Sequence, residues 1–381
     1  MKFDVAIVGS GILGLAHAYH LSKAGLKVAV FERNARPVGA SIRNFGMIWP
    51  IGQPPGEIRQ IALESRGYWL EMLHDAGIWH RECGSLHLAY APDELGVLEQ
   101  FVALAPEYGY GCEMISADGA QNKSPVVRRE GLRGAMWSPD ELCVDPRVVL
   151  GDLPSFLHSR YGVEFYFSSP VTAIESGRVE AVGREFEADW ILCCPGDDLR
   201  TLFTELLEQE DIRLCKLQMM RAVPKSGFKI GPHLCAGLTL AHYANFQICD
   251  HLEALKARFQ DEYPEETKWG IHLLVSQNEQ GVLTIGDSHE YVETADPFLK
   301  EEIDRLILNY LDTFLPIDQI KVVERWHGVY AKHFDKPYAL LRPFERVGIL
   351  AGVGGTGMTL AFGLAARVIE QLGVISQVQR P

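Results

Sequence analysis

Val-Ala-Ile-Val-Gly-Ser-Gly-Ile-Leu-Gly, at residues 5–14, leads through a helix to Val-Ala-Val-Phe-Glu, at residues 28–32. The apolar residues 5–8 predict a strand, and a helix is expected from the glycines to about residue 24. A second strand over residues 27–31 ends on an acid eighteen residues after Gly14. A lone glycine pattern in a glycine-rich chain is often accidental, but strand, helix, second strand and acid in this order predict a dinucleotide-binding βαβ unit.

Each feature of this pattern has a physical task. Gly9 permits the tight turn, Gly11 lets the backbone approach a pyrophosphate, and Gly14 lets the helix pack closely on the strand. The phosphates would lie at the positive N-terminal end of the helix, where free N–H groups point at them. Glu32 would accept hydrogen bonds from two ribose hydroxyls and repel an additional 2′-phosphate.

Length and charge limit the classes of function. The 381 residues suffice for two domains or one elaborate α/β unit with a large core. A formal net charge of −14 argues against nucleic acid and anionic membrane surfaces as partners. A small anionic substrate stays open, because the local field decides its binding. No run approaches the ~20 apolar residues of a membrane span.

Eight cysteines are scattered without metal-ligand spacing, and we expect no metal site. The vicinal pair Cys193-Cys194 closes an apolar strand, so it is either two buried thiols or a redox pair. Because residues 1–4 enter the first strand directly, we expect no signal peptide. These features together predict a cytoplasmic protein.

The remaining sequence alternates helices and strands. Helices are expected over residues 57–75, 93–104, 146–162, 251–262, 297–314 and 357–372, with Asp145-Pro146 as a capping acid and first-turn proline. Strands are expected over residues 84–90, 163–167, 171–175, 178–182, 190–194, 213–223, 270–276, 282–285, 318–330 and 348–350. Residues 37–55 are expected to form a loop. This order indicates a nucleotide-binding domain interrupted by a sheet-rich insertion.

A second glycine-rich helix start follows the strand near residue 350, with glycines at 352, 354, 355 and 357. Its backbone N–H groups could stabilise negative charge on the pyrimidine edge of a reduced flavin. The alternative is tight packing of strand on helix without a ligand. Together with the N-terminal motif, the ligand-binding interpretation is favoured.

The two glycine motifs together resemble the D-amino-acid oxidase superfamily of FAD enzymes, which includes glycine and sarcosine oxidases. Further similar segments are Glu32-Arg33, residues 39–44, Asp145-Pro146, residues 170–172, residues 188–196, and residues 326–328 followed by 335–337. The resemblance implies an α/β fold in which a Rossmann-like FAD-binding domain carries an inserted antiparallel-sheet substrate domain. Residues 1–84, 145–212 and 325–381 would form the first domain, and residues 85–144 and 213–324 the second.

The resemblance also implies a set of cofactor-binding residues. They are Gly9, Gly11, Ile12, Leu13, Gly14, Glu32, Arg33, Ala40, Ser41, Arg43, Asn44, Val171, Cys194, Gly196, Gly354, Gly355, Thr356, Gly357, Met358 and Thr359. Some members of the superfamily attach flavin to a cysteine shortly before the last glycine motif. Since no cysteine lies beyond position 249, we expect FAD to be bound non-covalently.

The substrate side departs from the family pattern. Sarcosine-type members carry a carboxylate-binding lysine where this chain has Thr359, and glycine-type members carry an arginine where it has Tyr330. Residues 43–54 and 352–359 resemble a subgroup associated with aminophosphonate breakdown. Lys332 and His333, with Arg43, could receive a phosphonate, which carries more acceptor oxygens than a carboxylate. The expected substrate-binding residues are Arg43, Trp49, His327, Tyr330, Lys332 and Thr359, where Trp49 is either core or pocket wall.

The resemblance implies oxidation of a small amine by hydride transfer to flavin N5, with oxygen or a quinone as final acceptor. We identify no catalytic base in the sequence. An NAD-dependent dehydrogenase, a D-amino-acid-, glycine- or sarcosine-type enzyme, and a non-catalytic flavoprotein subunit are the alternatives. Asp287-Ser288-His289 cannot form a serine triad as sequence neighbours, and we interpret the run as a polar strand end.

Overall fold

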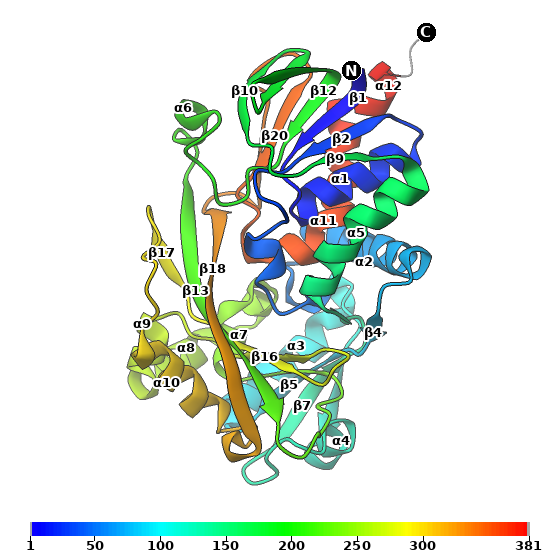
Figure 1. Ribbon diagram of the computed structural model, residues 1–381. Coiled ribbons are helices and arrows are strands. Elements are labelled where there is room, and N and C mark those ends of the chain that lie inside the picture. Colours follow the sequence, from blue (N-terminus) through cyan, green and yellow to red (C-terminus); the bar gives the residue numbers. More distant parts are fainter. Residues whose placement is uncertain (1, 379–381) are drawn as a thin grey trace.

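The N-terminal motif forms the predicted βαβ unit in the computed structural model, which describes residues 2–378 (Figure 1). Strand β1 (Lys2–Val8), helix α1 (Ile12–Lys23) and strand β2 (Val28–Phe31) follow one another, and the two strands pair in parallel. Residues 5–7 of β1 alternate between two cores. Val5 and Ile7 pack in the core shared with the helices, whereas Ala6 packs, as Phe3 does, in the core shared with a layer of strands on the opposite side.

The first sheet grows outward from this unit. On one side β2 pairs with β9 (Glu164–Tyr166), and on the other β1 pairs with β12 (Arg184–Cys193). Strand β12 then pairs with β20 (Val347–Ala351) through its last residues and with β11 (Arg178–Ala181) through its first. Strands β10 (Val171–Glu175) and β19 (Ala339–Leu341) lie outside these.

Four helices cover one face of the first sheet: α1, α2 (Glu57–Ala76), α5 (Pro146–Tyr161) and α11 (Gly357–Leu372) (Figure 1). As predicted, α5 begins after Asp145, whose side chain accepts a hydrogen bond from the Arg147 backbone N–H at 2.9 Å. No helix within residues 2–378 is long and apolar enough to cross a membrane.

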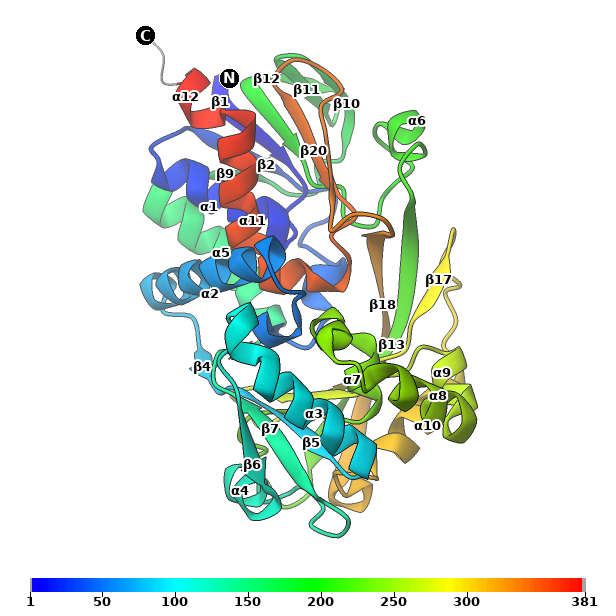
Figure 2. The same cartoon turned by 180° about the vertical axis from the view of Figure 1, so that it is seen from behind.

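The second sheet is mixed but mainly antiparallel. Its order is β17 (Glu290–Val292), β13 (Ile212–Pro224), β16 (Leu283–Gly286), β15 (Leu274–Gln277), β14 (His233–Ala236), β5 (Ser85–Ala89), β7 (Gly134–Ser138) and β6 (Glu113–Ser116), and β18 (Ile320–His333) also pairs with β13. Helices α3 (Pro92–Leu104), α8 (Leu252–Glu262) and α10 (Glu301–Leu311) pack on it, as Figure 2 shows from behind.

The α/β prediction is confirmed, and the two sheets contain the segments predicted for two domains. We keep that division as a proposal, because its borders at residues 213 and 325 fall inside β13 and β18. These paired strands extend from the second sheet toward the first (Figure 1).

Several element boundaries differ from the sequence predictions. The strand expected at 270–276 is β15 (Leu274–Gln277), and the helix expected at 297–314 is α10 (Glu301–Leu311). Within the expected loop 37–55 lies β3 (Met47–Ile48), which joins β8 (Leu142–Val144) and β4 (His80–Glu82) in a small third sheet. Strands of two or three residues are too short to show an apolar period, so only their pairing partners reveal them.

Candidate dinucleotide and substrate site

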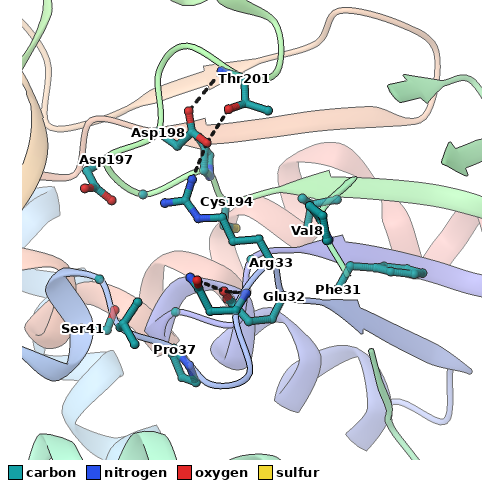
Figure 3. Close-up of a pocket in the computed structure, with 18 of the residues that line it drawn as sticks. Val8, Phe31, Glu32, Arg33, Pro37, Ser41, Cys194, Asp197, Asp198 and Thr201 are labelled. Carbon is teal, nitrogen blue, oxygen red and sulfur yellow. Dashed lines mark hydrogen bonds and ion pairs between the residues drawn. The ribbon is translucent and has the colours of Figure 1, made fainter. Parts of the chain in front are cut away.

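A cavity of about 380 Å³ opens at the carboxyl ends of β1 and β2 (Figure 3). The turn after β1, the end of β2, the loop at residues 37–43, the start of β10 and the turn after β12 line it. Ten of the predicted cofactor residues lie in this lining: Gly9, Gly11, Glu32, Arg33, Ala40, Ser41, Arg43, Val171, Cys194 and Gly196. The carboxyl edge of a parallel sheet is where such folds bind dinucleotides.

The three glycines of the first motif have distinct surroundings. At Gly9, with φ +99°, a β-carbon would lie 2.4 Å from the Cys194 carbonyl oxygen, and at Gly14 it would lie 1.9 Å from the Gly9 carbonyl oxygen. At Gly11 the β-carbon would meet only the Ser41 Oγ, at 3.2 Å. Gly9 and Gly14 therefore serve chain packing, whereas Gly11 leaves space in the cavity for a phosphate group.

Glu32 is buried at the end of β2, with 8% of its surface exposed. Its Oε2 accepts hydrogen bonds from the Ser10 backbone N–H at 3.1 Å and the Ser10 hydroxyl at 2.9 Å, and its Oε1 accepts from the Asn34 N–H at 3.0 Å. These contacts fix the carboxylate beside the first turn. The Asn34 Nδ2 also donates to Oε1, at 3.3 Å, so ribose hydroxyls would bind by replacing the two side-chain donors, the Ser10 hydroxyl and the Asn34 amide.

Arg33 and the turn after β12 form the opposite wall of the cavity (Figure 3). The Arg33 Nη1 donates to Asp198 Oδ2 at 2.6 Å. Burial raises the pKa of Asp198, but hydrogen bonds from Thr201 and Arg200 and the charge of Arg33 lower it overall. The carboxylate is thus ionised and held in place, and Arg33 is bound to protein at this edge.

The vicinal cysteines are both buried and free. Burial raises the pKa of the Cys194 thiol to about 12, and that of the Cys193 thiol still further. A thiol that resists ionisation is a poor nucleophile, which favours the interpretation as buried thiols over a redox pair.

The loop at residues 39–44 connects the cavity to β18. Ser41 Oγ accepts from the Ile12 backbone N–H at 3.0 Å, which ties the loop to the start of α1 next to Leu13. Asn44 Nδ2 donates to the Ser41 carbonyl at 2.8 Å, so its side chain holds the loop in shape. Arg43 lines the cavity, and its Nη1 donates to the His327 carbonyl at 3.2 Å.

The second glycine motif, from Gly352 to the start of α11, lies against β18 and outside the lining of this cavity. A β-carbon at Gly354 would be 3.4 Å from Lys332 Cγ, and one at Gly355 would be 3.4 Å from the Tyr330 Oη. Val329 of β18 does line the cavity, so the second motif lies immediately beyond its end. The cavity that contains the first glycine turn thus reaches β18 at Val329, one residue before the strand position on which the second turn packs.

Thr356 precedes α11, and the first turn of that helix contains Gly357, Met358 and Thr359. The Met358 carbonyl accepts from the Trp69 Nε1 at 2.9 Å, and the buried Thr359 Oγ1 accepts from the Trp49 backbone N–H at 2.9 Å. Trp49 is buried as well, and its Nε1 has no hydrogen-bond partner within the described chain. The hydrogen bond between Thr359 and the Trp49 backbone thus lies in the core. The lysine that sarcosine-type enzymes carry at position 359 would need a partner for its charge there.

The predicted cations around Tyr330 differ in availability. His333 points to Glu210, with its Nε2 2.9 Å from Oε2, and its Nδ1 accepts from two backbone N–H groups. The prediction that His333 is a free cation for the substrate is therefore wrong. The Lys332 Nζ lies 3.4 Å from the Tyr291 hydroxyl. The pKa of His327 is lowered, mainly by burial and then by the charges of Arg43 and Lys216.

Sequence reasoning missed a cluster of three imidazoles near Tyr330: His242, His272 and His289. His289 belongs to the run that was interpreted as a polar strand end. Its neighbour Ser288 instead accepts a hydrogen bond from the Gln218 backbone N–H at 3.1 Å. The turn between β15 and β16 could have indicated from the sequence that two of these histidines lie together. Antiparallel pairing of the two strands places residue 272 beside residues 287–289.

Comparison with known proteins identifies the family of this chain. The family model described as FAD dependent oxidoreductase matches residues 4–371. Glycine oxidase of Bacillus licheniformis is 27% identical over 217 residues, which cover 54% of this chain and 57% of that protein. Mitochondrial sarcosine dehydrogenase of Homo sapiens is 25% identical over 175 residues, 45% of this chain but 19% of that protein. The matched region thus spans only part of these relatives.

Solved structures extend the comparison to the whole fold. The crystal structure of glycine oxidase from Geobacillus kaustophilus superposes with a TM-score of 0.78, covering 99% of this chain and 95% of that chain at 19% identity. At this identity the similarity establishes the fold.

Proposed function

The chain belongs to the family of FAD dependent oxidoreductases, and on that premise we propose that it binds FAD non-covalently and oxidises a small amine that carries an anionic group. The observation that carries the proposal is that one cavity is lined by the first glycine turn, Glu32 and Val329 of β18, while the second glycine turn packs on the next residue of that strand, Tyr330. A nicotinamide enzyme that used the first motif alone would have no need of the second.

The chain's own residues suit this cofactor. Glu32 and the open space at Gly11 would hold the ribose and phosphates, and Ser41 and Arg43 would border the phosphates. The N–H groups at the start of α11, from Gly357 to Thr359, would face the negative charge of the reduced ring. When bound, FAD supplies the acceptor for the α-hydrogen of the amine, and the imine then hydrolyses to a carbonyl compound and an amine or ammonia.

An aminoalkylphosphonate, or its N-methyl derivative, is the substrate class we favour. Where glycine-type enzymes carry an arginine, this chain places Tyr330, which has no charge because burial raises its pKa well above the usual value. Thr359 is bonded to Trp49, so neither position offers a cation to a carboxylate. The positive charges of Lys332, beside Gly354, and of Arg43, at the cavity, would favour a more highly charged anionic group in this region.

Anaerobic mixing of purified protein with single amines tests the proposal. We expect 2-aminoethylphosphonate or its N-methyl derivative to bleach the flavin band near ~450 nm. Their kcat/KM should exceed those of glycine, sarcosine and D-alanine by at least about tenfold, because a poorly compensated carboxylate costs more than the ~1.4 kcal/mol this factor represents.

Three other outcomes would contradict the proposal in different ways. A preference for sarcosine or D-alanine would indicate a carboxylate anchor elsewhere in the chain. Flavin that no amine reduces would favour a non-catalytic flavoprotein subunit. Purified protein without flavin would contradict the cofactor assignment itself. With reduced enzyme in hand, reoxidation by air or by a soluble quinone identifies the acceptor.

A further inference from the structure

Three histidine rings stack beside β17 and β18, and we call them the histidine cluster: His242, His272 and His289. His242 ends α7 (Leu238–His242), His272 precedes β15, and His289 lies between β16 and β17. The ring centroids of His242 and His272 are 3.7 Å apart with planes 26° from parallel, and His289 lies 4.7 and 5.0 Å from these two rings.

Asp287 completes the arrangement. Its Oδ1 lies 3.2 Å from His272 Nε2, and its Oδ2 lies 4.0 Å from His289 Nε2. His289 donates from Nδ1 to the Gly270 carbonyl at 3.0 Å, which leaves its Nε2 with a lone pair facing the cluster. The Asp287 carboxylate thus lies beside the Nε2 atoms of His272 and His289, and the hydrogen bond to Gly270 fixes the orientation of the His289 ring.

Several of the converging atoms lack a partner. Among the described residues, His272 Nδ1 and Asp287 Oδ1 are buried without a hydrogen bond of acceptable geometry. Both side chains are more than nine-tenths buried, whereas His242 is exposed and gives the cluster access to the outside. Buried polar atoms without partners are costly, so unpartnered atoms at an accessible cluster point to a ligand.

The cluster is held without charge when empty. Burial lowers the pKa of His289 to about 4, and it lowers the pKa of His272 well below the usual range. Burial raises the pKa of Asp287 well above its usual range. The charge of Lys332 also lowers the pKa of His242 and His289.

Other titratable groups facing the cluster stay protonated near neutral pH. Burial raises the pKa of each of them: Tyr243, Tyr291, Tyr330, Cys215 and Cys235. Glu290, next to His289, is paired with Lys300 and lies 3.9 Å from Lys216. Proton uptake by this region therefore falls to the histidines and Asp287.

The stacking argues against a shared metal ion. A metal lies in the plane of each imidazole along the nitrogen lone pair, about 2.0–2.1 Å away for zinc. The lone pairs of two nearly parallel rings do not converge at that distance. One nitrogen from each ring lies within 4.8 Å of those of the other two, so the three rings can reach different oxygens of one oxyanion.

We propose that the histidine cluster binds the anionic end of the substrate, a tetrahedral oxyanion such as phosphonate, and takes up protons from solvent as it does so. The inference rests on the proposed function and names the subsite for its anionic group. An incoming anion stabilises imidazolium over imidazole, so a neutral ring gains a proton from water and donates an N–H to an anion oxygen. The ring centroids of His289 and Tyr330 are 6.5 Å apart, and Tyr330 lies against Gly355. Tyr330 therefore stands between the histidine cluster and the second glycine turn.

Calorimetry on the flavin-loaded enzyme tests the inference with ligands that lack an amine and cannot be oxidised. Propanesulfonate is the main probe because it does not titrate near neutral pH, and propylphosphonate and butyrate are compared with it. Titrations at pH 6 in two buffers of different ionisation enthalpy give the protons taken up. We expect net proton uptake, because the bound sulfonate raises the pKa of the imidazoles toward that pH, and we expect affinity to weaken as pH rises.

Two variants and one control assign the effect to the cluster. His242→Gln and His272→Gln should each weaken propanesulfonate binding by roughly 10- to 100-fold, the factor typical of one charge-assisted hydrogen bond, and should abolish proton uptake. His74→Gln changes a histidine at the end of α2 whose side chain is 88% exposed, and should leave both quantities unchanged. The flavin spectrum and Tm verify that each variant is folded.

The outcomes separate this inference from the proposed function. Sulfonate binding without proton uptake overturns the inference, and so does wild-type affinity for sulfonate in both cluster variants. Purified enzyme that retains Zn²⁺ and binds no sulfonate until the metal is removed would also overturn it. If aminoalkylphosphonates are oxidised but these results occur, only the subsite assignment fails. If propanesulfonate binds with uptake that depends on His242 while no amine reduces the flavin, the subsite stands and the oxidation proposal fails.

Discussion

Adding one methyl group at Gly14 should destabilise the fold, whereas a larger side chain at Gly11 should remove only the cofactor. In Gly14→Ala the new β-carbon would lie 1.9 Å from the Gly9 carbonyl oxygen, about 1.5 Å inside the 3.4 Å at which ordinary contact begins. The obstacle is backbone in a tight turn, so α1 must shift away from β1. Overpacking of this kind costs about 1–3 kcal/mol, and we expect the upper end because α1 also packs on α5 and α11.

Gly11→Val is the matched comparison. Gly11 has an ordinary φ of −66°, and its β-carbon would meet only Ser41 Oγ, at 3.2 Å. The apoprotein should therefore fold as the wild type does. The side chain would fill the space assigned to the pyrophosphate, and loss of two charge-assisted hydrogen bonds corresponds to about 3 kcal/mol or more, at least roughly 100-fold in affinity for FAD.

Thermal unfolding of the apoproteins and flavin titration separate the two effects. A loss of 3 kcal/mol in Gly14→Ala corresponds to a Tm lower by roughly 4 °C, from an unfolding entropy of about 2.1 cal/mol/K per residue. Gly11→Val should keep the wild-type apoprotein Tm and retain little flavin. A Gly11→Val protein with a full flavin complement would refute the placement of the phosphates, and an unchanged Tm in Gly14→Ala would refute the packing argument.

Three further predictions concern single side chains. Glu32→Ala should weaken FAD retention, and it should also lower the apoprotein Tm because Ser10 loses its hydrogen-bond acceptor. Equilibrium dialysis measures the FAD affinity and calorimetry the Tm. An unchanged flavin content would contradict the ribose assignment. Burial raises the pKa of Glu141 from 4.5 to about 7, so its contribution to stability is fully present below pH 4.5 and is lost as pH rises through 7. Glu141→Gln should therefore be more stable than wild type at pH 8.5, by up to about 3 kcal/mol, and should show no such gain at pH 5. Urea unfolding at the two pH values measures the difference. Tyr330→Arg should move the kcat/KM ratio of glycine to 2-aminoethylphosphonate upward by about tenfold or more, and an unmoved ratio would show that this position does not face the substrate.

Local sequence determined the nucleotide half of the molecule. Each signal in that half is read within a few residues: glycines at a turn, an acid at a strand end, and a capping Asp145 before Pro146. Backbone sterics and helix capping act over such short distances, so the predicted β1, α1, β2, α5 and α11 all appear within a few residues of their expected limits. The same holds for Glu32, which lies in the cavity as expected.

Tertiary pairing decided which polar side chains are available. His333 and Lys332 are neighbours in sequence, but alternation along β18 and the position of Glu210 leave His333 bonded to protein. Thr359 is paired with the Trp49 backbone, 310 residues away. No local pattern specifies such a partner, because it depends on which segments the sheets bring together.

The histidine cluster shows the same division most clearly. The sequence predicted strands near residues 270–276 and 282–285, but not which side chains from elsewhere in the chain would pack beside them. His242 reaches these strands from α7, and only the packing of α7 on the second sheet brings its ring within 3.7 Å of His272. Burial at that meeting point is also what lowers the pKa of His272 and His289, because desolvation is a property of the folded surroundings rather than of the residue itself.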